Sequence, residues 1–381
     1  MKTINFLTGN FIPENCAGTN RILALVRELE KKYKINVICI SEKGKKPNDF
    51  VFSENIHVYY IYQKEYDSEK FYTRAVHELY YALKLATRSN KFPSDMVIAT
   101  SPQMFIIPSV AIFARGKKII DIRDLVWEYI DGKSIYTKLV KFSLSKLMQY
   151  AITRYRYITV TNDHEYAWIV KNIPGSRDKI EKITNGIEIY KFEELNRLEK
   201  KEVSPFTLTY IGNVGIAQNI KVLVDIARKI PDIQINIVGE GNKYRELKEY
   251  ARQHQINNIT FFGKVHRDKI IDFYQNSSVL FAQLDEKFSA AMPSKLYEYA
   301  STGLPIIYAG TGVAREFVNK LENCTTINPG DVKALEVAVK RYKEAPTEIS
   351  QKNRDFVYKN FIREKQSQKM VDIVDKLLGA Q

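Results

Sequence analysis

One stretch of the chain, residues 279–310, constrains the fold more than any other. It reads VLFAQLDEKFSAAMPSKLYEYASTGLPIIYAG: an apolar run of strand length, a polar turn, apolar residues at helical spacing and a second apolar run. Pro293 suits the first turn of a helix, because its φ is fixed near the helical value and its missing N–H is not needed there. Gly303 ends the helix and Pro305 prevents its continuation. This order predicts an α/β fold with a parallel sheet, and places the helix start at the edge where such sheets bind ligands.

The predicted helix start has the features of a diphosphate-binding site. Its N–H groups are unpaired, it is the positive end of the helix dipole, and Lys295 lies in its first turn. Glu298 follows one turn later, within reach of a hydroxyl-bearing group such as a ribose. An ordinary crossover helix with a solvated lysine and glutamate has the same residue types, so both interpretations stay open. As an exposed side chain, Lys295 should contribute little to stability.

The segment PSKLYEYASTGLPII, residues 293–307, resembles the donor-site signature of family-four glycosyltransferases, the bacterial group 1 enzymes, in a branch with Pro-Ser-Lys before the glutamate. The resemblance covers nearly the whole chain and implies the GT-B architecture, in which two Rossmann-like domains face each other across a cleft. In this family the segment contacts the diphosphate of a nucleotide sugar. The resemblance therefore implies that Pro293, Ser294, Lys295 and Glu298 bind the donor, with Glu298 on the ribose. Helix dipole and Lys295 would together stabilise the leaving diphosphate, which gives Lys295 a catalytic role as well.

The chain departs from the family pattern at two places. Ala290 stands where the family usually has a first glutamate, near the transferred sugar. Asn213 and Gln218 replace an arginine and a lysine that are common in the loop after the first strand of the second domain. With those two cations missing, Lys295 is expected to carry more of the phosphate charge.

Two further glycine-containing turns follow predicted strands. Gly18 and Thr19 lie between a strand at residues 4–7 and an amphipathic helix, and the resemblance implies that they bind the donor at a helix N-terminus. A plain N-cap at Thr19 is the alternative. Gly239 and Glu240 follow the strand of IVGEG, which matches the second strand of the family's donor domain and implies donor binding there too.

A cluster of charged residues ends the strand at residues 118–122. Related glycosyltransferases place acceptor-contacting or catalytic residues at this point, and the Arg-Asp of this chain is similar to that of the Pro-Ser-Lys branch. The resemblance therefore implies catalytic roles for Arg123 and Asp124, which lie beside Asp121 and Glu128. A purely structural set of ion pairs is the alternative.

The length of 381 residues suits two domains. Residues 191–205, KFEELNRLEKKEVSP, shift abruptly to charged residues without apolar periodicity, which predicts a linker. We therefore expect an N-terminal acceptor-side domain over residues 1–192 and a nucleotide-sugar-binding domain over 205–350. The resemblance implies that residues 351–381 form terminal helices that cross back to the first domain.

The net charge of +14 predicts an anionic partner: nucleic acid, an anionic membrane surface or phosphorylated substrates. Nucleic acid is disfavoured, because no binding motif occurs and aromatic residues do not interleave with a basic run. Residues 134–157 predict a basic amphipathic helix that either lies on an anionic membrane or buries its apolar face in the domain. No signal peptide, membrane-spanning run or paired cysteine pattern is evident. A cytoplasmic protein is expected, with peripheral attachment to the inner face of the membrane left open.

Five scattered histidines and the lack of a DxD-type motif predict no metal, and no cofactor is expected because the nucleotide sugar is a substrate. The expected function is transfer of a hexosyl or N-acetylhexosaminyl group, from a donor that we expect to be UDP-linked, to a saccharide or lipid-linked acceptor in surface polysaccharide or glycoconjugate synthesis. Retention at the anomeric carbon is implied by the resemblance alone. The alternative is a sugar-nucleotide epimerase on the same fold.

Overall fold

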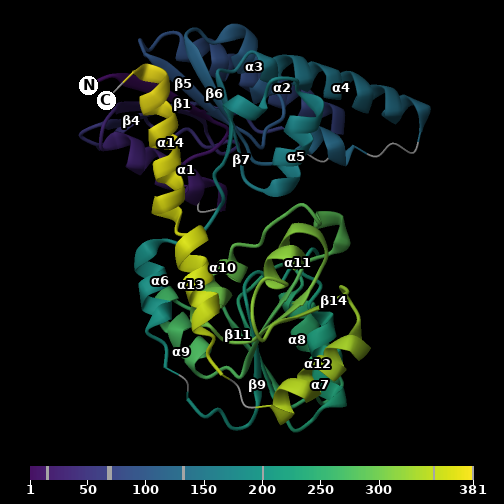
Figure 1. Ribbon diagram of the computed structural model, residues 1–381. Coiled ribbons are helices and arrows are strands. Elements are labelled where there is room, and N and C mark those ends of the chain that lie inside the picture. Colours follow the sequence, from purple (N-terminus) through teal and green to yellow (C-terminus); the bar gives the residue numbers. More distant parts are fainter. Residues whose placement is uncertain (14–16, 67–70, 131–133, 200, 346–347, 380–381) are drawn as a thin grey trace. The chain divides into compact units, whose positions relative to one another are not determined.

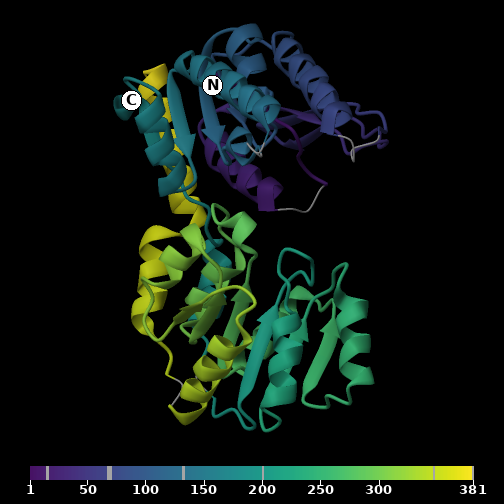
Figure 2. The same cartoon turned by 90° about the vertical axis from the view of Figure 1, so that its right-hand side faces the viewer.

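The computed structural model describes residues 1–13, 17–66, 71–130, 134–199, 201–345 and 348–379 (Figure 1). The chain divides into two compact units. The first contains Met1–Asn185 and Arg363–Gln381, and the second contains Gly186–Ile362. Each unit is an α/β structure with helices on both faces of a mainly parallel sheet (Figures 1 and 2).

The first unit is built on a sheet with the strand order β3-β4-β2-β1-β5-β6-β7-β8, in which β3 is antiparallel and the other pairs are parallel. Because the central strands are covered on both faces, consecutive side chains enter different cores: Phe6 packs with α1 and α14, and Leu7 packs with α2 and α3. The strands are β1 Thr3–Thr8, β2 Lys34–Ile40, β3 Phe50–Ser53, β4 Ile56–Ile61, β5 Met96–Thr100, β6 Lys117–Ile122, β7 Tyr157–Val160 and β8 Ile180–Lys182. The helices are α1 Ala17–Glu30, α2 Phe71–Ser89, α3 Ile106–Phe113, α4 Ile135–Thr153, α5 Asp163–Asn172 and α14 Arg363–Leu378.

The second unit has a parallel sheet with the order β11-β10-β9-β12-β13-β14, the doubly wound arrangement of a Rossmann fold. The order reverses between β9 and β12, and ligands of such sheets bind outside the carboxyl ends of the strands at this point. The strands are β9 Thr207–Ile211, β10 Gln234–Val238, β11 Ile259–Gly263, β12 Val279–Gln283, β13 Ile306–Ala309 and β14 Thr325–Ile327. The helices are α6 Ile189–Asn196, α7 Lys221–Lys229, α8 Tyr244–Gln253, α9 Ile270–Gln275, α10 Lys295–Thr302, α11 Gly312–Val318, α12 Val332–Glu344 and α13 Gln351–Asn360.

The organising stretch folds as its residues predict, with one shift. β12, α10 and β13 follow in order, and Gly303 ends α10 in the left-handed conformation with φ 73°. The helix begins at Lys295 rather than at Pro293, because Pro293 and Ser294 form a tight turn before it. Lys295 is therefore the first helical residue.

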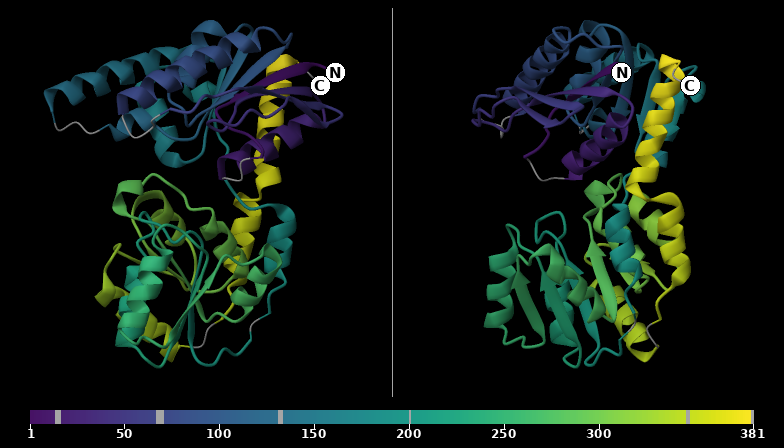
Figure 3. Two further views of the ribbon diagram at one scale, coloured as in Figure 1. Left: turned by 180° about the vertical axis from the view of Figure 1, so that it is seen from behind. Right: turned by 90° about the vertical axis from the view of Figure 1, so that its left-hand side faces the viewer.

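The boundaries between the units differ from those we expected. Part of the predicted linker is the helix α6, whose side chains Phe192 and Leu195 are buried in the core around α10. In the same core lies Val357 of α13, so this helix is part of the second unit as well. Of the two helices described after residue 350, α14 belongs to the first unit, where Met370 and Val374 pack in the core that contains α1 (Figure 3).

Two edges of the first sheet have strands with a weak pattern in the sequence. Residues 42–66 contain many polar side chains, yet they include β3 and β4 at one edge of the sheet. At the other edge β8 has 3 residues, and Ile187, further along the chain, forms a bridge with Ile362 in the second unit. Short edge strands carry few buried side chains, which weakens their pattern in the sequence.

None of the described helices combines the length and the apolar character that crossing a bilayer requires.

Candidate active site

Lys295 is the first residue of α10, and its side chain extends to Tyr210 near the carboxyl end of β9. Its Nζ donates a hydrogen bond of 2.9 Å to the Tyr210 hydroxyl and lies 4.1 Å from the centre of that ring. The Tyr210 hydroxyl in turn donates to the carbonyl of Asn213 at 2.6 Å. A Cβ on Gly212 would lie 2.3 Å from Nζ, so a side chain at this position would displace the lysine. Lys295 therefore lies at the carboxyl edge of the sheet, as the sequence predicts, and the structure adds that the strand order reverses at this point.

The expectation that Lys295 is an exposed, freely solvated lysine is wrong. The side chain is partly buried, and burial lowers its pKa from 10.5 to about 7, with Glu298 acting in the opposite direction. The cationic form is thus costly in the unliganded protein. An anion next to Nζ would restore the positive charge, because it would replace the lost hydration by a direct charge interaction.

The backbone at the start of α10 differs from the predicted set of free N–H groups. The N–H of Leu296 donates to the carbonyl of Pro293 at 3.1 Å, and that of Tyr297 donates to Ser294 at 3.2 Å. These two donors are used within the turn, so Pro293 and Ser294 shape the site through their carbonyls and their turn geometry. If an anion binds here, fewer backbone donors are available to it than the sequence predicts, and Lys295 is the cation beside them.

Glu298 lies one turn after Lys295 and is held by two partners. Its Oε1 is 2.6 Å from Nζ of Lys191 on α6, and its Oε2 accepts a hydrogen bond of 3.2 Å from the Tyr274 hydroxyl on α9. Each charged side chain of the pair keeps about a quarter of its surface exposed. Glu298 is therefore oriented but accessible, as a carboxylate that accepts hydrogen bonds from a ligand has to be.

The loops after β9 and β10 are joined beside Lys295. The N–H of Gly212 donates to Val238 at 2.8 Å, and that of Val214 donates to Glu240 at 2.9 Å. Gly239 has φ 125°, and a Cβ there would lie 2.0 Å from the Gly212 carbonyl oxygen. Gly239 thus allows the close approach of two loops, while Glu240 contributes its backbone carbonyl to their contact.

The two uncharged residues that replace the family's arginine and lysine pair with each other. The side-chain amide of Asn213 donates to Oε1 of Gln218 at 3.0 Å. The loop after β9 is thereby polar and ordered without a cation of its own, which fits the larger role expected for Lys295.

In the first unit the charged residues that were predicted to cluster after β6 have two kinds of environment. Some are buried or ion-paired, and others are partly exposed. Asp121 is fully buried and accepts two hydrogen bonds from Arg21, at 2.7 and 3.1 Å, and others from Thr100 and Thr159. Although burial alone raises its pKa, the Arg21 guanidinium and these hydrogen bonds hold the pKa of Asp121 below its ordinary value. Glu128 pairs with Lys141 at 3.3 Å. Both acidic residues therefore have the structural role that was kept as the alternative.

Arg123 and Asp124, by contrast, lie in the loop after β6 without such enclosure. The guanidinium Nη1 of Arg123 lies 2.8 Å from the position of a Cβ on Gly18, so the glycine provides the space for the arginine. Burial raises the pKa of Asp124, and Arg123 opposes the shift. The structure thus brings Gly18, Arg123 and Asp124 together at one edge of the first sheet.

Thr19 is buried in the first turn of α1, which begins at Ala17, so the alternative of an N-cap at Thr19 is wrong.

Several residues of these sites were missed in the sequence. Glu165 is buried, and burial raises its pKa to about 8, with Asp124 acting in the same direction. Its Oε2 accepts hydrogen bonds from the N–H and the hydroxyl of Thr161, at 2.7 and 2.9 Å. Asn162 followed three residues later by glutamate is a helix-start signature, so this position had a detectable signal. No local sequence pattern marks Lys191 or Tyr274, because their role depends on the packing of α6 and α9 against α10.

Lys191 provides a test of the pair with Glu298. We expect Lys191→Met to weaken donor binding about fivefold, because a partly exposed ion pair of this kind contributes up to about 1 kcal/mol. Isothermal calorimetry with the donor measures the change, and Lys191→Arg should restore most of the affinity. In a Glu298→Gln background the Lys191 substitution should have no further effect, since paired residues couple in a double-mutant cycle. Additive losses would contradict the pairing.

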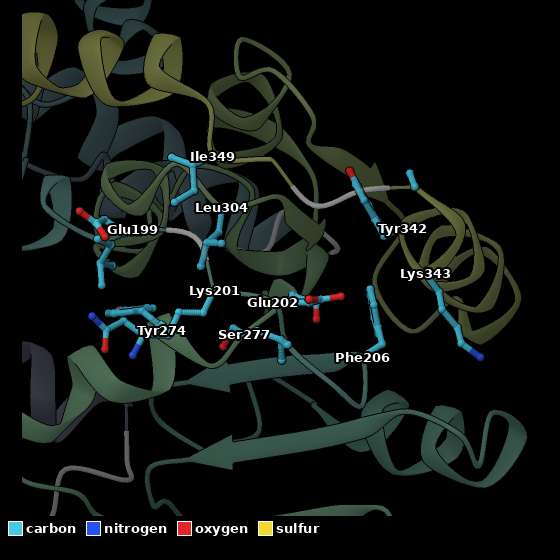
Figure 4. Close-up of a pocket in the computed structure, with 15 residues that line it drawn as sticks. Glu199, Lys201, Glu202, Phe206, Tyr274, Ser277, Leu304, Tyr342, Lys343 and Ile349 are labelled. Carbon is cyan, nitrogen blue, oxygen red and sulfur yellow. The ribbon is translucent and has the colours of Figure 1, made fainter.

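A cavity of about 560 Å³ in the second unit lies at the amino ends of β9 and β12 (Figure 4). Phe206 immediately precedes β9, and Ser277 and Ser278 precede β12, so the cavity opens at the opposite edge of the sheet from Lys295. Tyr274, whose hydroxyl donates to Glu298, also lines this cavity.

In the described part of the chain, no group of three or more His, Cys, Asp and Glu side chains is arranged to hold a metal ion.

Comparison with known proteins shows what the chain is similar to. Residues 191–362, nearly the whole second unit, match the model of the glycosyl transferases of group 1. An uncharacterized glycosyltransferase of Haemophilus influenzae is 25% identical over 314 residues, which cover 81% of this chain and 80% of that protein.

Solved structures show the same fold. Sucrose-phosphate synthase from Thermosynechococcus elongatus superposes with a TM-score of 0.73 at 14% identity over 100% of both chains. Anabaena HepE in complex with UDP and glucose has a TM-score of 0.66 at 14% identity, over 98% of this chain and 100% of that one. The predicted GT-B fold is thereby confirmed, whereas the subdivision into family four and its Pro-Ser-Lys branch stays a prediction. The second unit is therefore similar to the glycosyl transferases of group 1, and most of the chain is similar to a glycosyltransferase.

Proposed function

We propose that this protein is a glycosyltransferase that moves a hexosyl or N-acetylhexosaminyl group from a UDP-linked donor to a saccharide or lipid-linked saccharide acceptor in the synthesis of a surface polysaccharide or glycoconjugate. The observation that carries the proposal is the pairing of Lys295 and Glu298 one helical turn apart, at the strand-order reversal of the second sheet. A cation for the diphosphate and a carboxylate for the ribose thus lie in the order in which a nucleoside diphosphate presents these groups.

In the proposed reaction the bond between the anomeric carbon and the diphosphate oxygen breaks, and its electron pair leaves with UDP. The acceptor hydroxyl oxygen forms the new bond to the anomeric carbon and loses its proton. Lys295 stabilises the charge that develops on the leaving diphosphate, without a metal ion. Gly239 and Glu240 shape the donor site through the loop contact beside Gly212.

In the first unit we propose that Arg123 and Asp124 act on the acceptor and that Gly18 and Thr19 shape their surroundings. Asp124 keeps an accessible carboxyl group whose pKa burial raises, which suits a group that handles the proton of the acceptor hydroxyl. We further propose retention of configuration at the anomeric carbon, which rests on the resemblance.

The choice of UDP and of a saccharide acceptor is supported by relatives of the same fold. The HepE structure contains UDP and glucose. The loop after β9 is uncharged, and Lys295 lies at the point where the strand order reverses. Both features fit a donor that carries little negative charge beyond its diphosphate.

The proposal predicts that incubation with UDP-sugars releases UDP only when a saccharide acceptor is added. A coupled assay for UDP across a panel of donors and acceptors measures this, and nuclear magnetic resonance of the product reports the anomeric configuration. EDTA should leave the rate unchanged, because the lysine and not a metal ion neutralises the leaving group. Strong inhibition by EDTA, reversed by added divalent metal, would contradict the metal-independent mechanism.

A sugar-nucleotide epimerase is the second candidate, and one observation favours it. Burial raises the pKa of Glu165 to about 8, with Asp124 acting in the same direction, and burial also raises the pKa of Asp124, so the first unit has two carboxyl groups suited to proton transfer. An epimerase would convert the donor sugar without any acceptor. Donor conversion in the absence of acceptor would therefore favour the epimerase over the transferase.

A further inference from the structure

The helix α4 of the first unit exposes its apolar side chains over most of its length. Ile135, Leu139 and Phe142 are 86%, 63% and 60% exposed. The buried residues of α4 are all in its last third: Met148, Ala151 and Ile152. Figure 1 and the left view of Figure 3 show the first half of α4 extending beyond the other helices of this unit. Of the two interpretations of residues 134–157, the one with a fully buried apolar face is therefore wrong.

These exposed side chains form one continuous stripe. Residues 135, 139, 142, 146 and 150 follow one another at steps of three or four positions, which places them on the same face of a helix. The helix start does not depend on burial, because Ser134 and Thr137 form a reciprocal capping box. The exposed apolar and aromatic residues of the stripe and its borders are Ile135, Tyr136, Leu139, Phe142, Leu147 and Tyr150.

The charges on this helix are all positive. Residues 135–153 contain three lysines and no aspartate or glutamate. Nζ of Lys146 lies 5.7 Å from the centre of the Phe142 ring, and the Arg154 guanidinium lies 4.8 Å from that of Tyr150. Lys138 is exposed as well. Cations and aromatic rings thus share one surface, the combination found on helices that lie in the interface of a membrane.

We propose that this surface of α4, which we call the α4 stripe, docks the protein on an anionic lipid bilayer. The apolar side chains enter the boundary between headgroups and acyl chains, while Lys138, Lys146 and Arg154 face the headgroup phosphates. Charge complementarity favours this occupant over a second copy of the chain, because the net charge of +14 opposes self-association and attracts an anionic surface. The proposal does not depend on the sugar, the acceptor or the reaction.

The test is flotation of the full chain with vesicles of pure phosphatidylcholine and with vesicles that contain phosphatidylglycerol. At low ionic strength the protein should bind the anionic vesicles at least roughly tenfold better than the neutral ones, and added salt should reduce the difference. Leu139→Ser/Phe142→Ser should lower binding to anionic vesicles roughly tenfold. Lys138→Glu/Lys146→Glu should abolish the preference for anionic lipid.

Two matched controls use the second unit. Val337 of α12 is 69% exposed, and Val337→Ser removes an exposed apolar side chain outside the α4 stripe. Lys320→Glu/Lys333→Glu changes the net charge by the same amount as the α4 double variant, at exposed positions. Both controls should bind like the wild type, and melting curves verify that all variants are folded.

Three results would overturn the proposal: equal partitioning of the wild type into neutral and anionic vesicles, unchanged binding of both α4 variants, or equal losses in the controls. Sedimentation velocity tests the alternative partner of the α4 stripe, a second copy of the chain. A concentration-dependent dimer that Leu139→Ser/Phe142→Ser abolishes would assign the α4 stripe to a second copy of the chain and not to a bilayer.

Discussion

Replacing Lys295 with alanine should lower kcat about a hundredfold. The side chain lies at the strand-order reversal of the second sheet, and the loop after β9 supplies no cation of its own. A positioned donor to the leaving group contributes on the order of 3 kcal/mol in the transition state. Steady-state kinetics with saturating donor and acceptor measure the loss. Lys264→Ala, on the loop after β11, is the matched control and should have a small effect.

The lowered pKa of Lys295 gives this prediction a signature in pH. In the proposed role the free protein binds the diphosphate through the cationic form of Lys295, whose pKa burial lowers to about 7. The value of kcat/KM should therefore fall by about tenfold per pH unit above that point, since this parameter reports the free enzyme. Lys295→Arg should regain part of the rate and lose the fall, because a guanidinium stays protonated.

The same lysine should make stability depend on pH. Its pKa is lowered from 10.5 in the unfolded chain to about 7 in the folded protein, so between these values the unfolded chain binds a proton that the folded protein does not. The free energy of unfolding should therefore rise with pH from about 7 upward, and Lys295→Met should remove this rise. Melting curves between pH 6 and 9 measure it. Near-normal turnover of Lys295→Ala together with a wild-type pH dependence of melting would exclude the proposed role.

Glu298→Gln should weaken donor binding by about 1 to 3 kcal/mol, or roughly 5- to 150-fold in Kd. The carboxylate is held between Lys191 and Tyr274, so it is already oriented in the unliganded protein, which suits the proposed contact with a ribose hydroxyl. Hydrogen bonds to charged groups contribute this much, and the amide has the same shape without the charge. Isothermal calorimetry with UDP and with the intact donor measures the change.

The control for Glu298 is Tyr274→Phe, which removes one partner of the carboxylate and keeps its charge. This variant should lose less affinity than Glu298→Gln, because the pair with Lys191 stays in place. A donor Kd for Glu298→Gln equal to that of the wild type would contradict the ribose assignment, whatever the effect on turnover.

The sequence predicted the second unit best where single residues impose local geometry. Glycine and proline act through their own backbone geometry, so a glycine followed closely by a proline marks the end of a helix. Gly303 and Pro305 therefore made the order of β12, α10 and β13 predictable from the sequence. The environment of Lys295 could not, because its burial depends on Tyr210 and on the missing side chain of Gly212, which are distant in sequence. A lysine in a first turn has the same local pattern whether it is solvated or enclosed.

The helix α6 shows a second limit. Its buried residues Phe192 and Leu195 are surrounded by charged neighbours, so the segment resembles a linker until α10 provides a surface to pack on. Lys191, which holds Glu298, lies in this helix and was assigned to a linker for the same reason. The two residues of the ion pair are more than a hundred positions apart, and no local pattern connects them.

The return of α14 to the first unit determines the order in which the chain can fold during synthesis. The second unit is continuous in sequence, Gly186–Ile362, so all of its strands have left the ribosome before α14 is made. The first unit still lacks the helix that covers the core around α1, where Met370, Val371 and Val374 pack. Its apolar surface stays uncovered until residues 363–378 emerge, so the part translated first is completed last.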